Sequence, residues 1–213
     1  MEKFNVYFAG GLFDHKELAG NLHLALAIEK VAPQYHIVLP QNSASNAARA
    51  IGEIRDRDFE MLFGADCLLA NFDGTELDSG SVVEFCIAKM LDLPTVLLRT
   101  DFRDKCDNGC DPWNLMCSGY PRTKNCLINA MLLFCGVKDL SAVADREETI
   151  ARQVADALDE MRAVPSRLTR EHAFSVYRDT RDAIGNLMPE IFPDDRLREL
   201  VSVKTAHGIY AEK

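Results

Sequence analysis

The sequence predicts an α/β fold in which a doubly wound parallel sheet carries helices on both faces. Three observations lead to this prediction. Short runs of β-branched, aliphatic and aromatic residues alternate with longer segments whose apolar residues recur at helical spacing. Gly, Pro, Asn and Asp gather between the two kinds of segment, where the chain must turn. The alternation continues over about the first 100 residues, as expected when helices join parallel strands.

Each element follows from a local pattern. The run NVYFA is apolar and ends at Gly10 and Gly11, so we expect a first strand there. Leu18, Leu22 and Leu26 then fall on one face of a helix. Similar runs and stripes follow along the chain. The predicted strands are 5–9, 35–40, 66–72 and 94–99, and the predicted helices are 15–31, 46–65 and 82–91.

The pattern changes after residue 100. Segment 101–125 is long, polar and rich in turn residues, and loops of this length are often functional. The apolar run 126–137 suits either a last strand or a buried helix. The remainder is helical in character. We therefore expect an α/β domain of residues 1–140 and a helical C-terminal extension of residues 141–213, and one hypothesis is that the extension packs on another subunit.

Composition and charge limit the function. The chain has 213 residues, 47% of them hydrophobic and 27% charged, which is typical of a globular protein. A net charge of −9 without a block of Lys and Arg argues against nucleic acid or anionic membrane as a partner. The N-terminus lacks a secretory pattern, and no apolar run reaches the length of a membrane span. Seven cysteines, an odd number, favour reduced thiols and a cytoplasmic location.

The fold class predicts where a ligand binds. In a doubly wound sheet the site lies beyond the carboxyl ends of the strands, where the strand order reverses. For the flavodoxin-like order, loops 10–13 and 73–81 face that point, and the second loop leads to Glu84. Ser81 and Glu84 match the S-x-x-E capping box, so one interpretation is that Glu84 only caps a helix. The functional interpretation is that the helix N-terminus lowers the pKa of Glu84 and keeps it as an anionic nucleophile.

Other carboxylates accompany Glu84. Four aspartates lie near the ends of the third strand or in the helices beside it: Asp58, Asp66, Asp73 and Asp78. A pair of carboxyl groups at one site suits displacement at a glycosidic carbon, because one attacks the carbon and the other manages the proton of the leaving group.

Four segments, in this order, resemble the nucleoside 2-deoxyribosyltransferase family: VYFAGGLF, RDRDFEMLFGADCLLANFDG, DSGSVVEFCIAKMLDLPTVLLRTDFR and WNLM. The resemblance covers about residues 4–118. It implies transfer of the 2-deoxyribosyl group between nucleobases by double displacement, without a metal or redox cofactor. Glu84 is implied to attack C1′ of a 2′-deoxynucleoside and form an ester, and a second free base is implied to reverse the step.

The resemblance also implies roles for three residues around Glu84. Tyr7 matches the tyrosine whose hydroxyl holds the nucleophile, and Asp58 and Asp78 match two aspartates that bind sugar hydroxyls and handle the base proton. Asp78 is favoured beside the base. The ordinary alternatives are a strand aromatic in the core for Tyr7, a solvated helix face for Asp58 and a turn or cap for Asp78.

Further residues are implied to bind substrate. Asn114 and Met116 match residues that the family supplies to the neighbouring subunit's site, which implies a homo-oligomer with shared active sites. A loop amide that bonds its own backbone is the alternative for Asn114. Gly10, Phe13 and Gln41 are expected to line the base pocket.

Departures from the family leave alternatives open. The best-known members end in an aromatic-acidic tail that helps to hold the 5′-hydroxyl, whereas this chain continues into the extension. One alternative is a deoxynucleoside 5′-monophosphate N-glycosidic hydrolase, which needs serine and arginine after the first strand, where this chain has GGLFDHKE. Another is a non-catalytic nucleotide-sensing domain. Cys106, Cys110, Cys117 and Cys126 fit no common zinc pattern, so no metal is expected.

Overall fold

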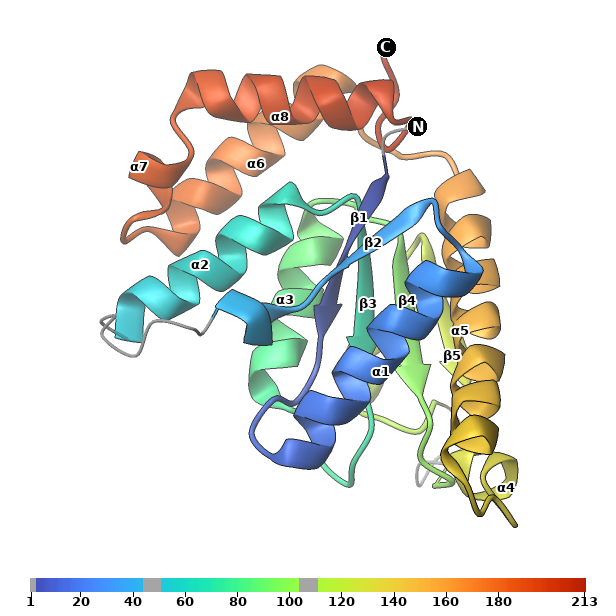
Figure 1. Ribbon diagram of the computed structural model, residues 1–213. Helices are drawn as coiled ribbons and strands as arrows, with labels where there is room; N and C mark the ends of the chain where they lie inside the picture. The colour runs from blue at the N-terminus through green and yellow to red at the C-terminus, as the bar shows by residue number, and fades with distance from the viewer. Residues whose placement is uncertain (1–2, 44–50, 104–110) are drawn as a thin grey trace.

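The computed structural model describes residues 3–43, 51–103 and 111–213, which form one sheet with helices on both faces (Figure 1). The strands are β1 (Phe4–Ala9), β2 (Tyr35–Val38), β3 (Cys67–Asn71), β4 (Thr95–Arg99) and β5 (Thr123–Leu127). All pairs are parallel and the order is β2-β1-β3-β4-β5, which confirms the predicted flavodoxin-like α/β class. The order reverses at β1, between β2 and β3.

The helices lie in three groups (Figure 1). One group covers one face of the sheet, a second covers the other face, and a third lies over the second. The first group is α1 (His15–Val31) and α5 (Leu140–Ala163), the second is α2 (Ile51–Gly64) and α3 (Ser79–Met90), and the third is α6 (Arg170–Ile184), α7 (Met188–Ile191) and α8 (Asp194–Ala206).

Strand β1 shows how the sheet separates two cores. Successive side chains of a strand point to opposite faces. Val6 and Phe8 therefore join the core under α1 and α5, whereas Tyr7 and Ala9 join the core under α2 and α3. This alternation places the only tyrosine of β1 on the α3 side, where Glu84 also lies.

The C-terminal third is built into the same chain. Helix α5 contributes Ile150, Val154 and Leu158 to the core that it shares with α1. Helices α6 to α8 contribute apolar residues such as Phe174 and Tyr177 to the core under α2 and α3. These apolar side chains are thus buried against their own sheet and helices, and the hypothesis of packing on another subunit is not needed to cover them.

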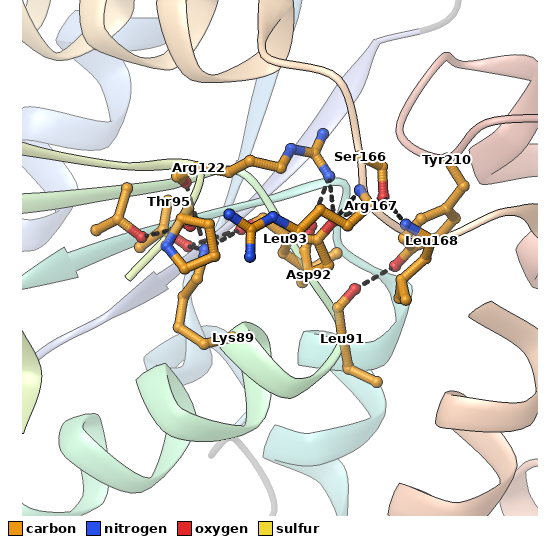
Figure 2. A network of polar contacts seen from close by, with 12 residues as sticks. Lys89, Leu91, Asp92, Leu93, Thr95, Arg122, Ser166, Arg167, Leu168 and Tyr210 are labelled. Carbon is orange, nitrogen blue, oxygen red and sulfur yellow. Dashed lines mark hydrogen bonds and ion pairs between the residues drawn. The ribbon is translucent and has the colours of Figure 1, made fainter. Parts of the chain in front are cut away.

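A polar network fastens the segment between α5 and α6 to the turn between α3 and β4 (Figure 2). Asp92 sits in that turn at a φ of 52°, a left-handed conformation that aspartate tolerates better than most residues. Its Oδ2 accepts from Ser166 Oγ at 2.6 Å, from the Arg167 amide at 3.1 Å and from Arg122 Nη1 at 3.1 Å. Since both Asp92 and Arg122 are buried, the network replaces water for the carboxylate and for Nη1 of the guanidinium.

Two expectations about the end of the sheet need correction. The last strand begins at Thr123, inside the segment expected to be loop. The apolar run after it does not form a buried helix, because α4 (Ala130–Leu133) leaves Met131 61% and Leu132 69% exposed. Residues 46–50 of the second predicted helix lie outside the described residues.

Candidate active site

Tyr7 and Glu84 meet on the α3 side of the sheet. The Tyr7 hydroxyl donates a hydrogen bond of 2.5 Å to Oε1 of Glu84. Tyr7 is fully buried, and burial together with the neighbouring Glu84 raises its pKa far above the usual value. The phenol therefore stays neutral and keeps its proton for the carboxylate. Tyr7 is at once a core aromatic and a polar partner.

The start of α3 differs from the expected capping box. The helix begins at Ser79, and its N-cap is Asp78, whose Oδ2 accepts from the Ser81 amide at 2.7 Å and from Ser81 Oγ at 2.8 Å. Ser81 is therefore not the cap, and Glu84 does not reach back to it. Glu84 lies in the second turn, beyond the reach of most of the stabilisation that a helix N-terminus gives an anion.

The pKa of Glu84 is raised to about 7, contrary to the expectation of a lowered value. Burial is the largest cause, because a carboxylate loses its hydration in the core. The charges of Asp58 and Asp78 also raise it, while the hydrogen bond from Tyr7 lowers it. Glu84 is thus a carboxyl group that is partly protonated and partly ionised near neutral pH.

Asp58 approaches the same pair from α2. It is partly buried, and the loss of hydration raises its pKa to about 6. Its charge contributes to the raised pKa of both Tyr7 and Glu84. Tyr7 and Glu84 are thus joined by a hydrogen bond, and Asp58 from α2 and Asp78 at the start of α3 act on Glu84 through their charges.

The C-terminal extension braces both helices that carry these carboxylates. Asp56 of α2 is buried, and its Oδ2 accepts from the amide of Leu187 at 3.0 Å and from the side-chain amide of Asn186. The hydroxyl of Tyr210 donates to the carbonyl of Leu91, at the end of α3, at 2.7 Å. Sequence reasoning missed these contacts, since nothing local pairs Asn186 or Tyr210 with residues more than 100 positions earlier.

A cavity of about 610 Å³ opens at the carboxyl ends of the strands, on the α1 and α5 side. The loop after β1, the loop after β3 and the two helices form its walls. Among the described residues, Phe13, Asn21, Asp73, Asp78 and Glu147 contribute to the lining. The position agrees with the switch point of the strand order.

Asp78 links this cavity to the Tyr7–Glu84 pair. Tyr7 and Glu84 do not line the cavity, because they lie on the α3 side of the sheet. Asp78 lines it and also acts on the pKa of Glu84. Within the described residues, the two hydrogen bonds to the Asp78 carboxylate use Oδ2, which leaves Oδ1 for a ligand.

The residues expected in the base pocket lie around the loop after β1, but Phe13 lines the cavity whereas Gly10 and Gln41 do not. Asn21 donates to the carbonyl of Gly11 at 3.0 Å and to Oε1 of Gln41 at 3.4 Å, so it ties Gln41 to this loop. A Cβ at Gly10 would lie 3.2 Å from Cβ of Asn71, and glycine is therefore what lets the loop pass close to the end of β3. Asn21 is the member of this group that the sequence pattern did not reveal.

The loop after β3 is held by groups from the end of β4. Arg99 is buried and donates from Nη1 to the carbonyl of Phe72 at 2.5 Å and from Nη2 to that of Gly74 at 3.0 Å. Asp73 accepts from the amide of Thr100 at 2.6 Å and from its hydroxyl at 2.7 Å. These bonds fix the segment that leads to Asp78 before any ligand arrives.

Asn114 and Met116 lie apart from this group. Asn114 caps a short 3₁₀ turn (Leu115–Cys117) by accepting from the amide of Met116 at 3.0 Å, as the ordinary interpretation of a loop amide expects. Met116 is 70% exposed, and neither residue lines the cavity. Trp113 and Cys117 are buried on either side and anchor the exposed segment between them.

The described residues also bear on metal binding and on membrane insertion. No group of three or more His, Cys, Asp or Glu residues there is placed to hold a metal ion, and Cys106 and Cys110 fall outside that part of the chain. Within the same residues, no helix has both the length and the apolar composition needed to cross a membrane.

Residues 6–116, just over half of the chain, match the family model described as nucleoside 2-deoxyribosyltransferase. The chain belongs to this family. The match contains Tyr7, Asp58, Asp78 and Glu84 and ends at Met116, before the extension begins. No curated protein sequence matches the chain.

Solved structures show similarity at low sequence identity. A conserved protein from Enterococcus faecalis V583 is 22% identical with a TM-score of 0.50, over 69% of this chain and 98% of that one, and supports the fold. A 2-deoxyribosyltransferase from Leishmania mexicana is 20% identical with a TM-score of 0.43, over 55% of this chain and 86% of that one. A 2-deoxyribosyltransferase from Bacillus psychrosaccharolyticus is 14% identical with a TM-score of 0.41, over 46% of this chain and 74% of that one.

Proposed function

We propose that this protein transfers the 2-deoxyribosyl group of a 2′-deoxynucleoside to a free nucleobase through a covalent intermediate on Glu84. The observation that carries the proposal is the hydrogen bond of 2.5 Å between Tyr7 and a buried glutamate, in a chain of the nucleoside 2-deoxyribosyltransferase family. Asp58 and Asp78 supply further carboxyl groups beside that glutamate.

In the first step, an ionised oxygen of Glu84 attacks C1′ of the nucleoside. The bond between C1′ and the base nitrogen breaks, and its electron pair leaves with the base, which takes a proton from a neighbouring carboxylic acid. Charge develops on the sugar as in an oxocarbenium ion, and the carboxylates around C1′ stabilise it. The product is a 2-deoxyribosyl ester of Glu84 and a free base.

In the second step, a nitrogen of the acceptor base attacks C1′ and the ester bond breaks. Its electron pair returns to the oxygen of Glu84, and the proton of the acceptor nitrogen passes to the carboxylate that donated in the first step. The enzyme returns to its starting state. No electron is gained or lost overall, so the cycle needs no redox cofactor, and carboxyl groups of the chain carry the proton transfer and charge stabilisation for which a metal could otherwise serve.

The pKa of Glu84 suits this cycle. A value of about 7 leaves a substantial ionised fraction at neutral pH, while a carboxylate with little hydration is a stronger nucleophile than one in water. The Tyr7 hydroxyl holds one oxygen of Glu84 and keeps the side chain in one orientation. Tyr7 acts on the reaction through Glu84.

We assign the base proton to Asp78 and the sugar hydroxyls to Asp58. Asp78 lines the cavity that has room for the base, and its Oδ1 is available there. Asp58 is partly buried on α2, and its charge acts on Glu84. Phe13, Gln41 and Gly10 would then border the base.

The remaining substrate contacts are proposed to come from a second subunit. Asn114 and Met116 stand on an exposed, anchored segment that no described part of the same chain covers, which suits insertion into a neighbouring site. The enzyme would then be a homo-oligomer with shared active sites. The odd number of cysteines supports activity in the reducing cytoplasm.

The test is base exchange with purified protein. 2′-Deoxyinosine is incubated with and without free adenine, and the products are separated by chromatography. If 2′-deoxyinosine is inert, thymidine replaces it as the donor. We expect a new deoxynucleoside only when the acceptor base is present. Free deoxyribose formed at the same rate with or without adenine would instead indicate a hydrolase, and inertness toward both donors and their 5′-monophosphates would indicate a sensing domain.

Glu84→Gln connects the activity to the proposed nucleophile. The variant keeps the size and hydrogen-bonding capacity of the side chain but not its charge, and we expect turnover to fall by about 10³-fold or more. The matched control is Glu199→Gln on α8, an exposed glutamate far from the site. Substantial retained turnover in the first variant, or equal loss in both, contradicts the assignment of Glu84.

A further inference from the structure

Asp56 lies in α2, two residues before Asp58, and points in nearly the opposite direction. Because an α-helix has 3.6 residues per turn, side chains two positions apart differ in direction by about 200°. Asp58 acts on Glu84 through its charge, whereas Asp56 meets the extension. Phe63, which follows Asp56 by two turns and shares its side of α2, has its ring 5.2 Å from that of Tyr177. One side of α2 therefore packs on the extension while the other carries Asp58.

The carboxylate of Asp56 is held by donors on both of its oxygens. It is buried, at 1% exposure. Oδ1 accepts from Nε of Arg55 at 2.9 Å and from Nη2 at 2.6 Å, and Oδ2 accepts from the Leu187 amide at 3.0 Å and from the side-chain amide of Asn186. Burial opposes ionisation, but these bonds outweigh it and hold the pKa of Asp56 below its usual value. Asp56 is therefore an anion at neutral pH, bound in part by the turn between α6 and α7.

Both partners are shaped for the contact at Asn186. Asn186 has a φ of 51°, a left-handed conformation that asparagine tolerates, and its side chain and the next backbone amide reach the same carboxylate oxygen. On α2, a Cβ at Gly52 would lie 3.2 Å from Nδ2 of Asn186, so the glycine leaves the space that this amide occupies. The turn lies well beyond Met116, where the match to the family model ends. The contact is thus a feature of the extension.

We propose that Asn186 is a positioning residue that, through Asp56, fixes α2 and with it the approach of Asp58 to Glu84. The two aspartates are about 3 Å apart along the helix axis, so a displacement of α2 at Asp56 is passed on to Asp58. A displacement of about 1 Å at a catalytic group can cost about 10²-fold in rate. This inference rests on the proposed function, because it takes Asp58 to act on the reaction.

The test places a like charge at this contact. Asn186→Asp keeps the size of the side chain and tolerates the left-handed backbone, but it sets a second carboxylate against Asp56. The substitution is made in the wild type and in Asp58→Asn. The matched control is Gln153→Glu, which adds the same charge at an exposed position of α5.

We expect Asn186→Asp to lower kcat/KM for base exchange about tenfold in the wild-type background. In the Asp58→Asn background the further loss should be less than about twofold, because the group that Asn186 positions is already gone. Gln153→Glu should leave both proteins unchanged. Urea unfolding of each variant establishes that all of them are folded under the assay conditions.

A second readout follows the carboxyl of Asp58 without turnover. Loss of hydration raises the pKa of Asp58 to about 6. If α2 loosens, water reaches this carboxyl, so its pKa should fall by about one unit in Asn186→Asp and stay the same in Gln153→Glu. An NMR titration of ¹³C-labelled aspartate carboxyls measures the change, and Asp58→Asn identifies the signal.

Two kinetic outcomes overturn the positioning role: an equal loss in both backgrounds, or full turnover in a folded Asn186→Asp protein. If the aspartate variant does not fold, Asn186→Gly decides the same comparison, because it removes the donor and suits the left-handed backbone. A wild type without base exchange refutes the transferase, and the NMR titration then decides alone. A fall in pKa confined to Asn186→Asp supports the positioning of Asp58 by the extension, and an unchanged pKa overturns it.

Discussion

The hydroxyl of Tyr7 lies 2.5 Å from Oε1 of Glu84, although the two residues are 77 positions apart in the chain. Strand β1 directs Tyr7 to the α3 face, and α3 presents Glu84 from its second turn. The donor partly offsets the loss of hydration that raises the pKa of Glu84. The contact therefore tunes a buried acid as well as orienting it.

Tyr7→Phe is expected to shift the pH dependence of the reaction. In the wild type, kcat/KM should rise with pH through about 7, as Glu84 ionises. Removing the hydroxyl removes a bond that favours the ionised form, so the pKa of Glu84 rises and this limb moves to higher pH by about one unit. Rates measured from pH 5 to 9 for both proteins check the shift. An unmoved limb with uniformly lower rates would mean that Tyr7 has only a structural role.

Glu84→Gln is expected to make the protein more stable at neutral and alkaline pH. The folded pKa of Glu84, about 7, lies above the value of 4.5 for an unperturbed glutamate, so the folded state holds the proton more tightly. Below pH 4.5 the carboxyl is protonated in both states and its ionisation costs nothing. Between pH 4.5 and 7 the unfolded state ionises first, and the wild type loses up to about 3 kcal/mol of folding free energy.

Urea unfolding of the wild type and Glu84→Gln at pH 5 and pH 8 measures this cost. The stability difference in favour of glutamine should grow between the two pH values and stay constant above pH 8. A stability difference that does not depend on pH would show that burial does not make the ionisation of Glu84 costly in the folded state. The expected pattern is that of a site at which stability is given up for reactivity.

The sheet could be predicted from the sequence because its signals are local. Apolar strand runs and Gly10 at the end of the first strand each act within a few residues. The leucine stripe of α1 predicted the helix but not its buried face, because Leu18, Leu22 and Leu26 are 37%, 41% and 58% exposed. The start of α3 was misjudged for a related reason: both Asp78 and Ser81 are good caps, and only the geometry shows that Asp78 accepts the amide bonds. Local preference alone does not choose between two adequate caps.

The environment of the site could not be predicted in the same way. The helix position suggested a lowered pKa for Glu84, but burial, which depends on the whole core, has the larger effect. The bonds from Asn186 to Asp56 and from Tyr210 to Leu91 join distant parts of the chain and leave no local pattern. The Tyr7–Glu84 pairing was implied by the family resemblance, and nothing in the spacing of the two residues points to it.

Asp78→Asn and Asp58→Asn are expected to separate two roles. If Asp78 donates the proton to the leaving base, Asp78→Asn should lose about 10²-fold or more in rate on 2′-deoxyguanosine. It should lose much less on 7-methyl-2′-deoxyguanosine, whose base already carries a positive charge and leaves without protonation. Asp58→Asn should affect both substrates equally. The opposite pattern would exchange the two assignments.

Mixing two inactive variants tests the shared active site. Glu84→Gln lacks the nucleophile, and Asn114→Ala lacks the amide proposed to reach the neighbouring subunit. In a dimer with two shared sites, random reassociation makes half of the dimers mixed, and each mixed dimer has one intact site. We therefore expect about a quarter of wild-type activity after mixing. Activity no greater than the sum of the separate variants would mean that each subunit builds its own site.

Asp92→Ala is expected to loosen the attachment of the extension. Within the described residues, Nε and Nη2 of buried Arg122 have no hydrogen-bond partner. The guanidinium therefore depends on the two bonds that Nη1 donates, to the carboxylate and to the carbonyl of Asp92. Loss of the carboxylate leaves a buried charge uncompensated, and the left-handed backbone at residue 92 suits alanine poorly. Together these effects should cost about 3–5 kcal/mol in urea unfolding.

Two further variants show which effect dominates. Asp92→Asn tolerates the left-handed backbone and still accepts from Ser166, so it should cost less than alanine. Adding Arg122→Met to Asp92→Ala removes the unpaired charge and should restore part of the lost stability, because a buried pair is costly mainly when one partner is missing. If Asn costs much less than Ala and Arg122→Met restores nothing, the cost arises from the backbone conformation and the lost bonds to Ser166 and Arg167, between α5 and α6, and the ion pair contributes little.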